Sequence, residues 1–154
     1  MSSIINVIYV IILVCVAWQD YKTRIIHNKF HIIIFSLAIV QMLLIPEYRI
    51  TDRLIGMLAV SVPMLLLTLL IPGGFGGGDI KLMAASGFFL GTSSILCAMI
   101  LAIIAGSVYG IIMLKNRKRD RKDQFAFGPF LAIGLSIAAF WGNEIVSWYL
   151  KIQH

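Results

Sequence analysis

The sequence predicts an all-α, polytopic membrane protein with about six transmembrane helices, and two observations carry that prediction. Of its 154 residues, 60% are hydrophobic and only 13% are charged, which is far from the composition of a soluble domain. The apolar residues also form long runs, and a helix needs about 20 of them to cross the ~30 Å hydrocarbon core of a bilayer. We therefore expect a single membrane-embedded domain over residues 1–154.

Six apolar segments are candidate spans, separated by polar or turn-forming residues. In chain order they are Ser3 to Trp18, Phe30 to Pro46, Leu54 to Pro72, Ile80 to Gly91, Ile95 to Leu114, and Phe125 to about Tyr149. No basic region precedes the first segment, so we expect it to stay in the protein rather than act as a cleaved signal peptide. Fusing the short fourth segment with the fifth would give a helix about 54 Å long, too long for the bilayer. A break within Gly91 to Ser94 is therefore expected.

Lysine and arginine indicate the orientation of these spans. With the N-terminus outside, the cytoplasmic connections are residues 19–29, 73–81 and 115–124, and they hold ten Lys and Arg residues against three on the other side. This excess follows the positive-inside rule, and omitting the fourth span would move the basic run KNRKRDRK outside. The net charge of +6 therefore indicates topology and contact with lipid rather than nucleic-acid binding. We expect a multi-pass protein of the cell (inner, cytoplasmic) membrane.

Two of the seven acidic residues, Asp20 and Asp79, stand directly against apolar segments at the cytoplasmic face. Two carboxyl groups that share a site resist joint ionisation, so one holds a proton while the other stays charged. Such a pair can activate a water against a peptide bond and protonate the leaving nitrogen. The pattern predicts an aspartic protease dyad. Solvated or interfacial positions account for the other five acids, which are Glu47, Asp52, Asp120, Asp123 and Glu144.

Glycines at positions 73, 74, 76, 77 and 78 precede Asp79. Without side chains they leave room for a substrate backbone, and they permit a positive φ just before a helix begins. A simpler interpretation stays open, in which Asp79 is only a helix N-cap and Asp20 is only an interfacial residue.

Three stretches of the sequence resemble the type IV prepilin peptidases, which are GxGD membrane aspartic proteases. They are DYKTRIIHN from Asp20 to Asn28, GGGDIKLMAASGFFLG from Gly76 to Gly91, and FGPFLAIG from Phe127 to Gly134. By this resemblance Asp20 and Asp79 are the catalytic pair. The residues that the resemblance places around the cleft are Gly76, Gly78, Lys81, Asn28, Phe127, Gly128 and Pro129. Pro129 also stands where the first turn of the last helix is expected.

The resemblance implies removal of a short basic leader from prepilin-like precursors at the cytoplasmic membrane face, ahead of the precursor's hydrophobic helix. Large family members also carry an insertion with paired cysteines and methylate the new N-terminus. Here Cys15 and Cys97 are isolated, so we expect a peptidase without methyltransferase activity and two buried packing cysteines. His27 stands where the family usually has proline, which predicts a less rigid turn.

No cofactor is expected, because dyad chemistry needs none. His27 and His31 at i, i+4 could face a metal together, but no third ligand is evident. The pairs Gly87 with Gly91 and Gly106 with Gly110 favour helix contacts within the chain, and a homo-oligomer is possible.

Two other functions stay open. One is a presenilin-type or signal-peptide-peptidase-type protease that cuts inside the bilayer, although those families place the first aspartate in a Tyr-Asp motif, whereas Asp20 follows Gln19. The other is a non-enzymatic assembly or carrier protein whose acids bind protons or orient helices.

Overall fold

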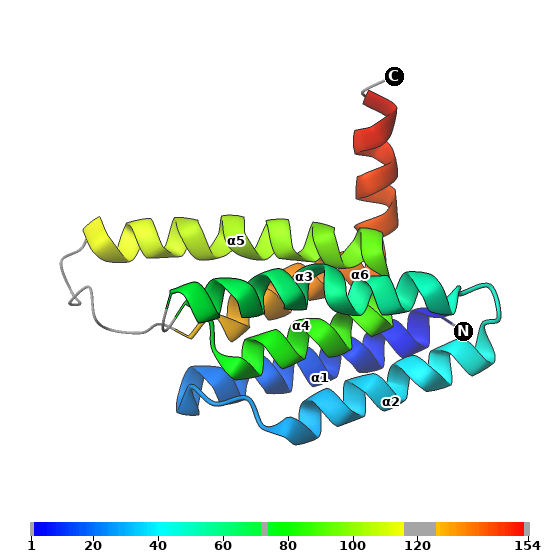
Figure 1. Ribbon diagram of the computed structural model, residues 1–154, viewed down its shortest axis with the longest axis horizontal. Helices are drawn as coiled ribbons and strands as arrows, with labels where there is room; N and C mark the ends of the chain where they lie inside the picture. The colour runs from blue at the N-terminus through cyan, green and yellow to red at the C-terminus, as the bar shows by residue number, and fades with distance from the viewer. Residues whose placement is uncertain (1, 72–73, 116–125, 153–154) are drawn as a thin grey trace.

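The protein folds into a bundle of α-helices. The computed structural model describes residues 2–71, 74–115 and 126–152, and within these ranges it has helices and no strand. The helices are α1 (Ser2–Thr23), α2 (Asn28–Leu44), α3 (Ile50–Leu70), α4 (Gly77–Leu90), α5 (Thr92–Lys115) and α6 (Gly128–Ile152) (Figure 1). The predicted all-α membrane fold is confirmed. The predicted end of the third span at Pro72, the basic run after Lys115 and the start of the sixth span at Phe125 lie outside the described residues.

Four of the described helices are long and apolar enough to cross a bilayer. They are α1, α3, α5 over Thr92–Ile112, and α6. The other two are shorter, with 17 residues in α2 and 14 in α4. At 1.5 Å per residue α4 is about 21 Å long, less than the hydrocarbon thickness. A complete crossing by α4, the total of six spans and an outside N-terminus therefore stay predictions.

The break between α4 and α5 falls at Gly91, as the sequence predicts. Gly91 has φ of 84°, a left-handed conformation that glycine adopts without a steric penalty. Its N–H donates to the carbonyl oxygen of Gly87 at 2.9 Å, and Thr92 Oγ1 donates to the carbonyl oxygen of Asp52 at 2.9 Å. The chain thus reverses direction in one residue, and the turn is tied to the start of α3.

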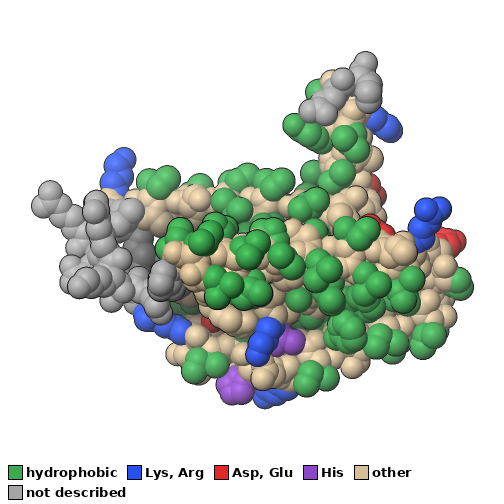
Figure 2. Space-filling view, in the orientation of Figure 1, with side chains coloured by type: hydrophobic (Ala, Val, Ile, Leu, Met, Phe, Trp, Pro, Cys, Tyr) green, Lys and Arg blue, Asp and Glu red, His purple; other side chains and the backbone are tan. Residues whose placement is uncertain are grey.

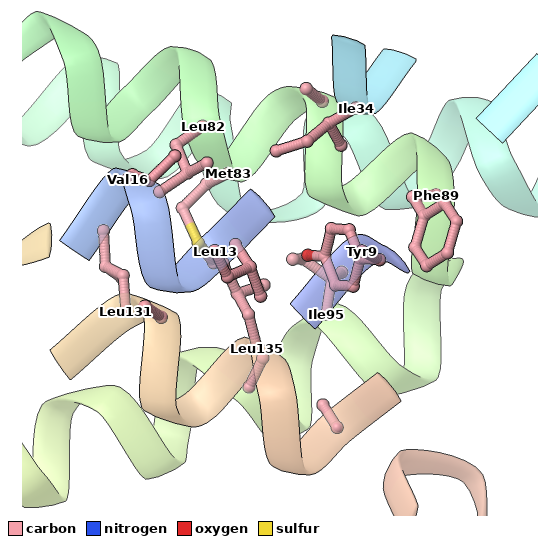
Figure 3. Packing of buried hydrophobic residues seen from close by; sticks show 14 of the residues in the cluster. Tyr9, Leu13, Val16, Ile34, Leu82, Met83, Phe89, Ile95, Leu131 and Leu135 are labelled. Carbon is pink, nitrogen blue, oxygen red and sulfur yellow. The ribbon is translucent and has the colours of Figure 1, made fainter. Parts of the chain in front are cut away.

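The short helix α4 lies at the centre of the bundle and contacts α2, α3, α5 and α6. Eight of its 14 residues are buried, namely Asp79, Leu82, Met83, Ala85, Ser86, Gly87, Phe88 and Phe89. Figure 3 shows Leu82, Met83 and Phe89 among apolar side chains of α1 and α6. The rings of Tyr9 and Phe89 stack with centroids 4.2 Å apart. Burial on nearly all sides explains why so short a helix is stable here.

The outer surface of the bundle is apolar. Figure 2 shows hydrophobic side chains spread along the visible face of the helices, with only a few charged side chains among them. Residues such as Leu43, Leu69 and Leu70 are more than two-thirds exposed. A surface of this kind suits lipid rather than water, which agrees with a membrane protein.

Helices α3 and α4 approach closely at two glycines. A Cβ built on Gly56 would lie 2.6 Å from the carbonyl oxygen of Gly87, so neither position has room for a side chain. The expected helix contact within the chain is thus confirmed for Gly87. Gly106 lies against the Phe127 ring, whereas nothing lies within 4 Å of a Cβ on Gly110.

Helix α6 leaves the bundle near its end. Its buried residues run from Gly128 to Gly142, and its C-terminal part stands away from the other helices in Figure 1. Cys97 is buried in α5, but Cys15 is exposed on α1. The prediction that both cysteines are buried packing residues is therefore wrong for Cys15, because α1 turns that face outward.

Candidate active site

The structure brings Asp20 and Asp79 to one cavity. Asp20 lies near the end of α1 and is 6% exposed, and Asp79 lies in the first turn of α4 and is 8% exposed. Both line a cavity of about 250 Å³. The full lining is Asp20, Arg24, Ile25, Ile26, Gly76, Gly77, Gly78 and Asp79. Two buried carboxyl groups 59 positions apart in sequence therefore face the same small space.

The carboxylate of Asp20 is held by the start of α6. The buried N–H of Gly128 donates to Asp20 Oδ2 at 2.9 Å, and a Cβ on Gly128 would lie 2.5 Å from the same oxygen. Helix starts carry partial positive charge, so this position stabilises the ionised form of Asp20. Pro129 follows in the first turn, as predicted. The carbonyl oxygen of Phe127 accepts from the N–H of Leu131 at 3.1 Å and so begins the helix.

Asp79 is not the N-cap of α4, contrary to the simpler interpretation of the sequence. The N-cap is Gly76, with φ of −70° and ψ of 141°, and Asp79 is the third residue of the helix. Among the described residues the only glycine with positive φ is Gly91. Residues 74–78 thus adopt no positive φ, although their glycines would permit one, and the chain enters the helix through the extended conformation of Gly76.

The glycines before Asp79 face different surroundings. A Cβ on Gly76 would lie 3.2 Å from Asp79 Oδ2, and one on Gly78 would lie 3.0 Å from the Cβ of Ile26. Nothing lies within 4 Å of a Cβ on Gly77. Gly78 thus makes room for Ile26 of the α1–α2 connection, whereas Gly77 has an open side.

Two hydrogen bonds join the N-terminal part of α2 to the N-terminal part of α4. His31 Nε2 lies 3.1 Å from the carbonyl oxygen of Gly78, and Lys81 Nζ donates to Asn28 Oδ1 at 3.1 Å. A carbonyl oxygen only accepts, so His31 carries its proton on Nε2. Asn28 and His31 are three positions apart in α2, and Gly78 and Lys81 are three positions apart in α4. Residues at this spacing share one face of a helix. Sequence analysis considered His31 only as a possible metal ligand and missed this contact, which depends on the relative placement of α2 and α4.

His27 and His31 do not share a helix face. His27 is the N-cap of α2, with φ of −72° and ψ of 140°, and its ring contacts the side chain of Gln19. In the ranges that the structure describes, no group of three His, Cys, Asp or Glu side chains is placed to hold a metal ion.

The α1–α2 connection is shaped around the cavity. The N–H of Arg24 donates to the carbonyl oxygen of Asp20 at 2.8 Å, and Arg24 has φ of 54°. Non-glycine residues with positive φ are uncommon and often occur next to functional sites. The turn directs the following Ile26 against Gly78, so it fixes the distance between the end of α1 and the start of α4. Sequence analysis gave no sign of this role.

Comparison with known proteins yields a family model and several relatives. The model described as the type IV leader peptidase family matches residues 7–111, a stretch that contains both Asp20 and Asp79. The prepilin leader peptidase/N-methyltransferase of Bacillus subtilis (strain 168) is 28% identical over 146 residues, which cover 95% of this chain and 59% of that protein. This chain thus spans about three fifths of the length of the Bacillus protein.

Proteins of the same name match with higher identity over shorter stretches. The one from Xanthomonas campestris is 42% identical over 78 residues, covering 51% of this chain and 27% of that protein. The one from Legionella pneumophila is 41% identical over 75 residues, covering 49% of this chain and 26% of that protein. No solved structure matches the chain significantly.

Proposed function

The chain belongs to the type IV leader peptidase family, and from that premise we propose that it is a membrane aspartic endopeptidase for prepilin-like precursors. It removes a short basic leader at the cytoplasmic face of the cell membrane, just ahead of the precursor's hydrophobic helix. The names of its relatives, which are prepilin leader peptidases, support this substrate class. The observation that carries the proposal is the cavity that Asp20 and Asp79 share.

Asp20 is the ionised member of the pair in this proposal. Its Oδ2 accepts the N–H of Gly128, and the positive end of α6 favours a negative charge at that oxygen. A carboxylate held in this way takes a proton from water as the water oxygen attacks the carbonyl carbon of the scissile peptide bond. The product of this step is a tetrahedral intermediate.

Asp79 is the protonated member. Two negative charges disfavour each other in a cavity of about 250 Å³, so the pair shares one proton. Asp79 gives that proton to the amide nitrogen as the C–N bond breaks. The leader then leaves with a carboxyl group and the mature chain with a free amine. Asp20 has gained a proton from the attacking water. Transfer of that proton from Asp20 to Asp79 restores the starting state, with Asp20 ionised and Asp79 protonated.

The position of the cavity suits a substrate that is itself anchored in the bilayer. The cavity lies where α1 ends and α4 begins, between the apolar bundle and the connecting segments. A precursor whose apolar helix lies in the membrane presents the peptide bonds just before that helix at the interface. Its scissile bond therefore reaches the depth of the two carboxyl groups without the substrate helix unfolding.

Cleavage of a co-expressed prepilin-type precursor tests the proposal, with the product read out by intact mass and N-terminal sequence. We expect wild type to cut the precursor once, at the end of the leader. We expect the cleavage rate to fall by about 10² or more with Asp20→Asn or Asp79→Asn. Glu47→Gln is the matched control, because it neutralises an exposed carboxyl group in the α2–α3 connection. Wild-type cleavage by either aspartate variant, at an equal level of inserted protein, rejects the dyad.

The same experiment separates the rival functions. A cut deep within the substrate helix favours a presenilin-type or signal-peptide-peptidase-type protease. Binding of the precursor by wild type without any cut favours an assembly role.

We also propose that the new N-terminus is left unmethylated. The two cysteines of the chain lie in different helices, Cys15 in α1 and Cys97 in α5, and form no pair of the kind carried by the large methylating members. A product heavier by one methyl group contradicts this part of the proposal.

A further inference from the structure

A second polar cavity lies at the other end of the bundle, and the proposed peptidase reaction makes no use of it. Its volume is about 160 Å³, and Asn6 of α1 is part of its lining. Asp20 lies fourteen positions further along the same helix, which is about 21 Å at 1.5 Å per residue. The two cavities are therefore separate sites.

The most buried polar group of this cavity is the guanidinium of Arg53. The Arg53 side chain is 2% exposed, its Nη1 donates to the carbonyl oxygen of Phe88 at 3.0 Å, and its guanidinium lies 4.1 Å from the ring centroid of Tyr48. Guanidinium carries five N–H donors, and one of them is used by Phe88. Burying a cation is costly unless a negative charge compensates it.

No carboxylate of the described residues supplies that charge through an ion pair. The neighbouring acid, Asp52, attracts Arg53 electrostatically without forming an ion pair with it, and both of its carboxylate oxygens accept from the N–H of Thr92 at 3.4 Å. Glu144 lines the cavity, but it is exposed. Asp52 therefore compensates Arg53 only without direct contact, and an anion from outside the chain can still reach the guanidinium through the cavity.

A second group in the lining is also incomplete. Gln41 is 3% exposed, and its Oε1 has no hydrogen-bond partner. A buried carboxamide oxygen without a partner is unfavourable. A ligand that offers a hydrogen-bond donor to Gln41, as well as a negative charge to Arg53, would therefore be stabilised in this cavity. Asn143 also lines the cavity, and its Oδ1 accepts a hydrogen bond from Ser94 Oγ at 3.1 Å.

We propose that this cavity binds a phosphate ester that carries a hydroxyl group, as a glycerol phosphate does. The phosphate oxygens accept from Arg53, and the ligand hydroxyl donates to Gln41. A volume of about 160 Å³ holds about five waters at ~30 Å³ each, which is enough for such a headgroup. Gly142, which lines the cavity, is the last buried residue of α6, and the helix leaves the bundle beyond it. The exposed Trp148 and Tyr149 that follow are typical of headgroup depth.

Binding measurements on the full chain, purified in an uncharged detergent, test the proposal in two arms. One arm adds phosphatidylglycerol in mixed micelles, and the other adds free glycerol 3-phosphate, with phosphatidylcholine as the control lipid without a hydroxyl donor. We expect wild type to bind phosphatidylglycerol. We expect the affinity of Arg53→Gln for it to be lower by about 10-fold or more. Binding in the lipid arm alone identifies a lipid headgroup, and binding of the free compound identifies a soluble ligand. No binding in either arm, or equal binding of phosphatidylcholine, overturns the proposal.

Two further variants keep the test valid if Arg53→Gln does not fold. Glu144→Gln removes an exposed negative charge from the lining of the cavity, so we expect the affinity of the cavity for an anion to rise about 3-fold or more. We expect leader cleavage by this variant to stay unchanged. Gln41→Leu is expected to weaken glycerol 3-phosphate binding but to leave sulfate binding as in wild type, because sulfate carries no O–H donor at neutral pH. Weaker binding in Glu144→Gln would mean that Glu144 itself neutralises Arg53, and this result overturns the proposal.

Discussion

The backbone N–H of Gly128 donates to Oδ2 of Asp20 at 2.9 Å, although the two residues lie 108 positions apart. The contact is buried, and it joins the end of α1 to the first residue of α6. A Cβ on Gly128 would lie 2.5 Å from the same oxygen. The orientation of the Asp20 carboxylate therefore depends on a glycine from the last helix of the chain.

Gly128→Ala is expected to lower the rate of leader cleavage about a hundredfold, because the added methyl group displaces the Asp20 carboxylate. Initial rates in membranes, normalised to the amount of inserted protein, measure the effect. Gly110→Ala is the matched control, since nothing lies within 4 Å of a Cβ at that position of α5. Unchanged cleavage by Gly128→Ala would show that this contact does not position Asp20.

His31→Leu is expected to lower kcat about tenfold with little change in KM. The variant removes the donor to the Gly78 carbonyl oxygen, which lies one residue before Asp79. His31→Gln retains an N–H donor on a side chain of similar length and is expected to recover most of the rate. The comparison of kcat for the two variants at equal protein level is the measurement. Equal losses would mean that His31 acts only by filling space.

The parts of this structure that could be predicted from sequence are those with a local signal. Apolar runs of helical length located the helices, and the length limit of a span predicted a break within Gly91 to Ser94, which the structure places at Gly91. Asp20 and Asp79 stood out because each adjoins an apolar run, and the order of the spans predicted only that both lie at one membrane face. Their meeting in one cavity is what the structure adds.

What the sequence analysis missed depends on contacts between distant segments. The hydrogen bond from His31 to Gly78, the packing of Ile26 on Gly78 and the burial of Arg53 all require the relative placement of helices. None of these residues differs, in its local sequence, from an ordinary interfacial or loop residue. The glycines before Asp79 permit a positive φ, but residues 74–78 adopt none, because glycine permits that conformation without requiring it.

Asn28→Ala and Lys81→Ala are expected to have non-additive effects on stability. The hydrogen bond from Lys81 Nζ to Asn28 Oδ1 is exposed, so each single variant should cost about 0.5–1.5 kcal/mol. The double variant should cost little more than either one, because the same contact is lost only once. Denaturant unfolding in detergent, followed by helical circular dichroism, measures the cycle. Strict additivity would mean that the two side chains do not interact.

Gly87→Ala is expected to destabilise the protein by about 1–3 kcal/mol, because its Cβ would collide with the Gly56 carbonyl oxygen across the α3–α4 contact. Thermal unfolding in detergent measures the loss, and Gly110→Ala should unfold as wild type does. A wild-type unfolding temperature for Gly87→Ala would mean that α3 and α4 can move apart without cost.

Thiol labelling tests whether α4 crosses the bilayer and which way the chain is oriented. In a Cys15→Ser, Cys97→Ser background, Glu47→Cys is expected to react with a membrane-impermeant maleimide on intact cells. Lys115→Cys is expected to react only after permeabilisation, because five crossings from an outside N-terminus bring the end of α5 to the cytoplasm. Labelling of both on intact cells would mean that α4 does not cross. Labelling of Lys115→Cys alone on intact cells would reverse the orientation and place the Asp20 and Asp79 cavity outside, where the leader of a precursor is not presented.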